Sequence, residues 1–225
     1  MGRYISAEDH AIVSNAVAAA EEMTSGEIVT VLADRSDGYT DVALLWSIGV
    51  SFSLMSLFAV MPQPFMHFWD RNFAGWSHDW NHGELAGMTI ALGLIAFVAT
   101  WAVQYWQPVK FAMIPEPVKT ARAHDQAVKH FKVGAERRTH GSTGVLIYLS
   151  MREHRAEIVA DEPIAAKVPA EVWGEAMADM LSHIRTGRIA DGMAAGVRDV
   201  GEILTEHFPR SHDDTNELPD RLIEV

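Results

Sequence analysis

The chain has 225 residues, of which 48% are hydrophobic, and a formal net charge of −12 at pH 7. This acidic balance argues against a nucleic-acid partner, because phosphate binding requires a basic surface. The sequence contains no cysteine, so disulfides contribute nothing to the fold and the redox compartment cannot be inferred.

The first 41 residues predict one helix and one buried strand. Ser6 is expected to cap the helix, because its hydroxyl can accept a hydrogen bond from the first turn. The stretch Glu27–Ala33 is nearly all apolar after its first residue, which is typical of a strand covered on both faces. Because Met1–Asp41 lacks the apolar core of a signal peptide, we expect the next apolar segment to direct membrane insertion.

Two long segments without any Asp, Glu, Lys or Arg follow, Val42–Met61 and Leu85–Val109. Each is long enough for a helix to cross a bilayer, which takes roughly 20 residues. Two buried helices of a soluble core are the alternative, but core helices rarely stay uncharged all round over such a length. The sequence therefore predicts a membrane hairpin.

The loop between these segments, Pro62–Glu84, is rich in Trp, Phe and His. Aromatic residues favour the headgroup level of a bilayer, which predicts an interfacial belt. A metal site is the alternative, because His78 and His82 stand four residues apart and would share one helix face. His67, Asp79 and Glu84 lie nearby in the sequence as further ligand candidates.

The second half of the chain predicts three helices and two strands. The helices are expected at Val118–Ala135, at Ala170–Arg185 and from an Asp191 cap to Phe208, and the strands at Val145–Ser150 and Arg155–Ala160. His124 falls on the expected apolar stripe of the first of these helices, as a core-edge or a catalytic histidine. That stripe comprises Ala121, His124, Val128, Phe131 and Ala135.

One helix and one strand bury too little surface to be stable, so the N-terminal piece needs the later strands. We therefore predict one split α/β domain, formed by residues 1–41 and 110–210, with a small mixed β-sheet sandwiched by helices. The two-helix transmembrane hairpin with its loop, residues 42–109, interrupts this domain, and residues 211–225 form an acidic tail. The long crossover favours parallel pairing of the first two strands, and the short connection after them favours a hairpin.

Several short motifs together resemble the TPM-domain family, an α/β sandwich often attached to membranes. The motifs are TSGEIV at 24–29, THGSTGVLIYLS at 139–150, RAEIVADE at 155–162, Trp173, HFP at 207–209 and NELPD at 216–220. The hairpin inside the domain and the missing signal peptide depart from the common family pattern. The resemblance implies limited function: weak acid-phosphatase activity and photosystem repair in some plant members, receptor accessory roles in animals, and calcium binding in parts of the family.

No P-loop, nucleophile elbow, zinc-protease motif or dinucleotide fingerprint occurs in the sequence. The residues singled out are Glu27, Thr139, Asp161 and Glu162, because neighbouring strand ends could bring the carboxylates to one edge of the sheet. Oxygen ligands of this kind suit a divalent cation such as Ca²⁺. The alternative is that these charges are solvated at strand ends.

Basic residues flanking membrane segments stay on the cytoplasmic side. Arg71 is the one basic residue between the segments, whereas many follow the second one. We therefore expect an inner-membrane protein with two spans, with both termini and the α/β domain in the cytoplasm. It would act as a non-enzymatic accessory or interaction module, with the lipid bilayer and another membrane protein as partners. The alternative is a divalent-metal-dependent hydrolase of phosphate esters.

Overall fold

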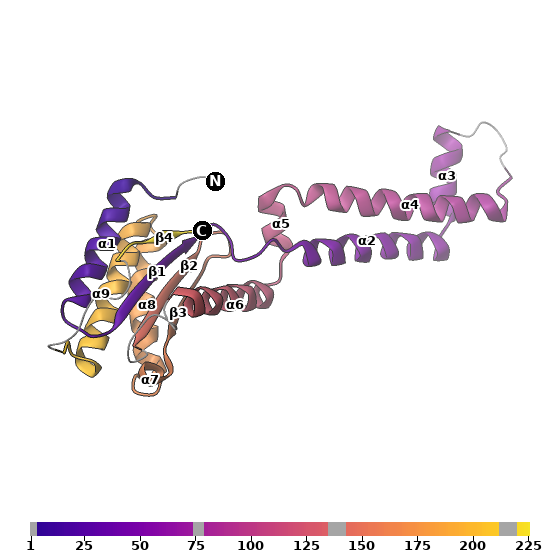
Figure 1. The fold of residues 1–225 in the computed structure, drawn as a ribbon. Helices are drawn as coiled ribbons and strands as arrows, with labels where there is room; N and C mark the ends of the chain where they lie inside the picture. The colour runs from indigo at the N-terminus through magenta and orange to yellow at the C-terminus, as the bar shows by residue number, and fades with distance from the viewer. Residues whose placement is uncertain (1–3, 74–78, 135–142, 212–219) are drawn as a thin grey trace. The chain divides into compact units, whose positions relative to one another are not determined.

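The computed structural model describes residues 4–73, 79–134, 143–211 and 220–225. The chain divides into two compact units. The sheet unit comprises Met1–Asp37 and Glu116–Val225, and the hairpin unit comprises Gly38–Pro115. Figure 1 shows the mixed sheet with its helices in the first unit and a helical pair in the second.

The sheet unit contains a four-stranded mixed sheet in the order β3-β2-β1-β4. β1 (Glu27–Ala33) pairs in parallel with β2 (Gly144–Ser150), and β2 pairs antiparallel with β3 (Arg155–Ala160), which confirms both predicted pairings. β4 (Ile223–Glu224) pairs in parallel with β1, in a stretch that we had assigned to an acidic tail. A two-residue strand has no periodicity to detect, and the buried Leu222 beside it anchors this end of the chain.

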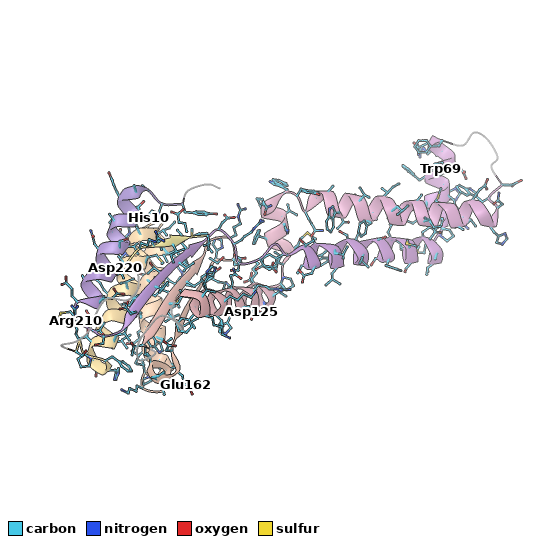
Figure 2. All side chains as sticks on the ribbon, in the orientation of Figure 1. His10, Trp69, Asp125, Glu162, Arg210 and Asp220 are labelled. Carbon is cyan, nitrogen blue, oxygen red and sulfur yellow. The ribbon has the colours of Figure 1, made fainter. Side chains whose placement is uncertain are left out.

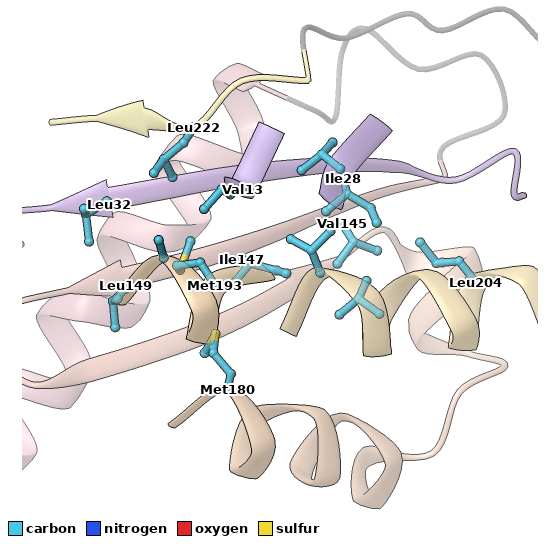
Figure 3. Close-up of a cluster of buried hydrophobic side chains, with 14 of the residues drawn as sticks. Val13, Ile28, Leu32, Val145, Ile147, Leu149, Met180, Met193, Leu204 and Leu222 are labelled. Atoms are coloured by element: carbon cyan, nitrogen blue, oxygen red, sulfur yellow. The ribbon is translucent and has the colours of Figure 1, made fainter. Parts of the chain in front are cut away.

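Helices cover both faces of the sheet. They are α1 (Ala7–Glu21), α6 (Glu116–Gly134), α7 (Glu162–Ala165), α8 (Ala170–Ile184) and α9 (Ile189–His207). Along β1, Ile28 and Leu32 pack with residues of α1, α8 and α9, as Figure 3 shows, whereas Val29 and Val31 pack with α6 on the other face. Because successive side chains of a strand point to opposite faces, a strand between two helical layers must be apolar throughout.

α6 presents a different face to the sheet from the one predicted. The structure buries Ala123, Ala127 and Phe131, and it leaves His124 exposed beside Glu157, with 3.2 Å between Nδ1 and Oε2. Two alanines one turn apart let the helix axis approach the strands, whereas the predicted stripe would have placed an imidazole there. His124 is therefore a surface ion-pair partner rather than a core-edge residue.

α9 begins earlier than predicted. Arg188 occupies the N-cap position and Asp191 lies in the first turn, where its carboxylate is 3.9 Å from the Arg188 guanidinium. A carboxylate is favourable anywhere in the first turn of a helix because of the helix dipole, so the acidic residue alone does not locate the cap.

α8 and α9 pack closely because Gly192 lacks a side chain. A Cβ atom at this position would lie 2.7 Å from the carbonyl oxygen of Met180 and 2.6 Å from Cγ1 of Ile184. The carbonyl belongs to the α8 backbone and cannot move aside without displacing the helix.

We therefore expect Gly192→Ala to destabilise the sheet unit by about 1–3 kcal/mol, because overpacking outweighs the better helix propensity of alanine. The measurement is the midpoint of urea denaturation of the full chain in detergent, followed by circular dichroism. Gly174→Ala is the matched control, because a Cβ on this exposed α8 residue would meet nothing within 4 Å. Equal midpoints for the two variants would contradict the close packing.

The hairpin unit contains α2 (Thr40–Val60), α3 (Gln63–Asn72), α4 (His82–Val103) and α5 (Gln107–Met113). α2 and α4 pack closely because Gly93 has no side chain: a Cβ there would lie 2.5 Å from the Met55 sulfur. Hydrogen bonds join the two helices: Ser51 Oγ donates to the Gly93 carbonyl at 2.8 Å, and Gln104 Nε2 donates to the Ala43 carbonyl at 3.1 Å. Small residues and polar side chains at the interface are typical of helix pairs in membranes.

The hairpin helices differ from the predicted segments in two places. α4 ends at Val103 instead of continuing to Val109, because the chain turns at Gln104 before the short α5, which has Pro108 in its first turn. The predicted connecting loop contains the helix α3, whose N-terminal turn holds Pro64. Proline is favourable in a first turn, where its missing N–H has no partner to lose.

The chain leaves and re-enters the sheet unit along one edge of the sheet. Asp37 follows the carboxyl end of β1, and its carboxylate lies 3.3 Å from the Arg122 guanidinium of α6. Glu116 begins α6 and pairs with Arg155, which starts β3 opposite the last residue of β2. Both junctions thus lie at the carboxyl ends of β1 and β2.

We propose that the sheet unit folds without the hairpin unit. Replacing Gly38–Pro115 by a flexible Gly/Ser linker should leave a product with one cooperative unfolding transition, because no strand or core cluster of the sheet unit is removed. Adding Gly192→Ala to this variant should lower its midpoint as in the full chain. A product without a cooperative transition would refute the split-domain organisation.

Candidate functional site

Carboxylates gather at the edge of the sheet where β1 and β2 begin and β3 ends. The register places Glu27 opposite Gly144, and Val145 opposite Ala160, the residue before Asp161. Glu27 and Asp161 are both buried, at 5% exposure each. The sequence prediction that strand ends bring these two carboxylates to one edge agrees with this register.

The TSG turn between α1 and β1 is fastened to the end of α9. Thr24 Oγ1 donates to the Phe208 carbonyl at 2.6 Å, and the Ser25 amide donates to the same oxygen at 3.1 Å. Gly26 packs beside this contact, where a Cβ would lie 2.8 Å from Leu204 Cδ1 and would displace the end of that side chain. The TSG and HFP motifs therefore serve the structure by closing this edge.

Asp161 has a structural partner at the same edge. Its Oδ2 accepts the Gly144 amide at 2.8 Å, and its own amide donates to the Gly144 carbonyl at 3.0 Å. Glu162, in contrast, is the exposed first residue of α7. The two adjacent acidic residues are thus in different environments, and Thr139 lies outside the described residues.

Glu21 is the acidic residue of this edge that sequence reasoning missed. It is buried in the last turn of α1, and its Oε1 accepts the Ile28 amide at 2.8 Å. β4 pairs with β1 only at Val31 and Leu32, so the Ile28 amide has no strand partner on that side. The carboxylate of Glu21 replaces the missing strand and satisfies this buried donor.

Glu21 shares its surroundings with Glu27 and Asp220. Burial, the largest cause, raises the pKa of Glu21 to about 8 together with the nearby carboxylates of Glu27 and Asp220, while the hydrogen bond from the Ile28 amide lowers it. Figure 2 shows Asp220 beside α1 and β4, away from Glu162 at α7. Glu21 therefore interacts electrostatically with both Glu27 and Asp220.

The described residues do not assemble a metal site of the predicted kind. Across 4–73, 79–134, 143–211 and 220–225, no three His, Asp or Glu side chains converge so as to hold a metal ion. Two carboxylates of the edge already accept backbone amides, at Ile28 and Gly144. Calcium binding at Glu27, Asp161 and Glu162 therefore stays a prediction.

Of the two histidines predicted to form a pair in the hairpin unit, the structure describes only His82. His82 is the first residue of α4, and Asn81 before it is an extended N-cap whose side chain accepts the Glu84 amide. His78 lies outside the described residues, so the pair stays a prediction.

Two comparisons with known proteins agree with this fold. Residues 114–203, from the start of α6 into α9, match the family model of the TPM domain. The chain carries a TPM domain. The NMR structure of BA42 from the psychrophilic bacterium Bizionia argentinensis superposes with a TM-score of 0.57 at 16% identity, covering 100% of this chain and 98% of that one. No curated protein matches the chain.

The buried face of α1 carries the signal that could have revealed Glu21 in the sequence. Val13, Val17 and Glu21 recur at a spacing of four residues on the buried side of α1. An acidic residue on an apolar stripe is costly unless it accepts hydrogen bonds or is protonated. Such a position is therefore a signal of a special environment, and Glu21 satisfies both conditions.

The protonation of Glu21 predicts a pH-dependent stability. Because its pKa rises from 4.5 to about 8 in the folded chain, the native state binds the proton more tightly, and the free energy of unfolding falls as pH rises between these values. Glu21→Gln keeps an oxygen for the Ile28 amide without the charge. We expect it to be more stable than the wild type by about 1–3 kcal/mol near pH 9, with little difference near pH 4.

The measurement is urea denaturation across this pH range. Glu22→Gln is the control, because Glu22 is the exposed neighbour and should leave the pH profile of the wild type unchanged. Parallel pH profiles for the wild type and Glu21→Gln would contradict the buried, protonated carboxyl group.

Proposed function

We propose that this chain is a membrane-tethered TPM-domain protein that acts as a non-enzymatic interaction module of the bacterial inner membrane. The hairpin unit would be the tether, and the sheet unit would contact another membrane protein. The observation that carries the proposal is the exposure of the two long apolar helices.

α2 and α4 have the length and composition of membrane spans, with 21 and 22 residues, yet only 17% and 11% of their apolar windows are buried. Helices of a soluble core are buried, so the high exposure favours a hydrocarbon environment. Large apolar side chains are exposed along both helices, including Leu45, Phe52, Val60, Leu94 and Val98. In water such a surface would drive aggregation, whereas lipid tails would cover it.

Aromatic and basic residues support one orientation of these helices. Tyr105 and Trp106 follow α4 and are largely exposed, which suits an interfacial position. Lys110 and Lys119 come next in the sequence, whereas Arg71 is the one basic residue in the sequence between the two helices. We therefore propose that both termini and the sheet unit lie in the cytoplasm.

The sheet unit offers a surface for a protein partner. A groove of about 470 Å³ lies between α1 and α9. Its α1 wall is apolar, with Ala16, Ala20 and Met23, and its α9 wall carries Arg198 and Glu202. Met23 is 62% exposed at its rim. Shallow apolar grooves of this kind suit the side chains of a helix or loop from another protein.

Phosphate-ester hydrolysis is the alternative that the family resemblance implies. A metal-dependent hydrolase needs a cation that activates water and stabilises the leaving group. Among the described residues, no three His, Asp or Glu side chains converge so as to hold such an ion. Calcium at Glu27, Asp161 and Glu162 stays a prediction that a titration of the purified chain would test.

If the hairpin unit spans the membrane, alkaline carbonate should not extract the chain from it. We expect the chain to remain in the membrane pellet after carbonate washing and to be released by detergent. Because the natural sequence has no cysteine, single-cysteine variants report topology without background. Asn72→Cys, at the exposed end of α3, should react with an impermeant maleimide in intact cells, and Glu175→Cys on α8 only after permeabilisation.

Release of the chain by carbonate would refute the tether. Labelling of Glu175→Cys in intact cells, with Asn72→Cys protected, would refute the proposed orientation while leaving the tether standing.

A further inference from the structure

The hairpin unit contains a pocket of about 210 Å³ at the end where α2 begins and α4 ends. α2 contributes Thr40 to its lining, the end of α4 contributes Trp101 and Gln104, and α5 contributes Gln107 and Lys110. Figure 1 shows α5 after α4, at the same end of the unit as the beginning of α2. The pocket is large enough for several water molecules, so a small polar group can enter it.

The cation that lines this pocket has no carboxylate partner in the described part of the chain. Lys110 is partly buried, and its Nζ donates to the Gly38 carbonyl. None of the ion pairs between described residues includes Lys110. No Asp or Glu is among the described lining residues either. Because an ammonium has three N–H donors and is rarely buried unless it is paired, Lys110 favours an anionic ligand in the pocket.

Uncharged hydrogen-bond donors lie beside this cation. The exposed Thr40 hydroxyl belongs to the first residue of α2. Gln107 Oε1 is enclosed by the protein, so the amide group of Gln107 can offer the pocket only its N–H donors. The N-cap of α2, Tyr39, makes no side-chain hydrogen bond to the first turn, which leaves the positive end of this helix uncapped. Asp41 in that turn is exposed and is not a lining residue.

We propose that this pocket binds the phosphate of one anionic phospholipid of the phosphatidylglycerol type. The phosphate would accept hydrogen bonds from Lys110, Thr40 and the amide of Gln107, and the acyl chains would extend along the exposed apolar surface of α4. This inference rests on the membrane tether of the proposed function and adds a specific ligand to it.

The position of the pocket favours a lipid over a soluble phosphate. The exposed Tyr105 and Trp106 follow α4 directly, and aromatic residues of this kind mark the headgroup level of a bilayer. A lysine at this level can lay its apolar stem against hydrocarbon and keep its ammonium among the headgroups. Val98 and Val103 of α4 are exposed and apolar on the way into the bilayer, so acyl chains can cover them. A soluble phosphate would gain nothing from this surface.

Charge favours an anionic headgroup over a zwitterionic one. The ammonium of phosphatidylethanolamine would find no carboxylate among the described lining residues, and Lys110 would repel it. The glycerol headgroup brings hydroxyls instead and leaves the negative charge of the phosphate uncompensated. Basic pockets at the cytoplasmic ends of membrane helices are typical sites for anionic lipid headgroups.

Two substitutions test the donors separately. Lys110→Gln removes the charge, and its control is Arg71→Gln, which removes one charge from an exposed position of α3 outside the pocket. Thr40→Val removes the hydroxyl at nearly constant volume and leaves the Lys110 contact with Gly38 in place. Should Lys110→Gln fail to fold, as judged by circular dichroism in detergent, Thr40→Val decides the question.

The experiment reconstitutes the full chain in nanodiscs with equal amounts of phosphatidylglycerol and phosphatidylethanolamine. Native mass spectrometry after release counts the retained lipids. We expect the wild type and Arg71→Gln to retain phosphatidylglycerol over phosphatidylethanolamine by about tenfold, the factor expected for one charge-assisted contact. Lys110→Gln should retain the two lipids equally, and Thr40→Val should show a smaller preference than the wild type. Millimolar inorganic phosphate in the buffer should not change the preference of the wild type.

Equal retention of the two lipids by the wild type, or the wild-type preference in both Lys110→Gln and Thr40→Val, would overturn the proposal. Loss of the lipid on addition of inorganic phosphate would overturn it as well, because the pocket would then be a site for soluble phosphate. The carbonate experiment is independent of these outcomes, so a chain that stays in the membrane but shows no lipid preference would refute this inference alone.

Discussion

The parallel pairing of β1 with β2 joins two parts of the chain that are separated by the whole hairpin unit. All seven residues of β1 have partners in β2, from Glu27 opposite Gly144 to Ala33 opposite Ser150. This pairing lets helices from both sides of the insertion pack on the same strands. α1 and α9 cover one face, where Val13 and Val200 belong to one buried cluster. The closure of so long a loop is costly in entropy, yet this cost grows only slowly with loop length. An insertion whose ends return to one sheet edge is therefore tolerated.

The shortness of β4 affects the chemistry at the beginning of β1. It reaches only Val31 and Leu32, so the beginning of β1 lacks a strand partner on that side. Glu21 fills this place and is held near Glu27 and Asp220, where its pKa rises because charge is disfavoured. A structural need of the backbone thus produces a carboxyl group that binds its proton near neutral pH. The same arrangement explains why acidic residues at this edge are not by themselves evidence of a cation.

The sequence predicted those features that depend on local patterns. Continuous apolar runs located β1 and β2, and the absence of charge located α2 and α4, whose exposure agrees with the compositional argument. Features that depend on a distant partner were missed. Ile223 is a strand residue only because β1 lies beside it, and Glu21 is special only because the Ile28 amide has no other acceptor. His124 was placed on the wrong face because α6 approaches the sheet through alanines, and alanine gives a weak periodic signal.

The acidic composition of the chain explains why the sheet unit would need a covalent tether to stay at a membrane. Peripheral proteins bind anionic bilayers through basic patches, each basic residue contributing about 1 kcal/mol near the surface. A chain with a net charge of −12 gains no such attraction and would be repelled from an anionic leaflet. The hairpin unit supplies apolar surface instead, and its internal hydrogen bonds from Ser51 and Gln104 keep the two helices in one register. Under the proposed function, the TPM domain is therefore held at the membrane by the hairpin unit rather than by its net charge.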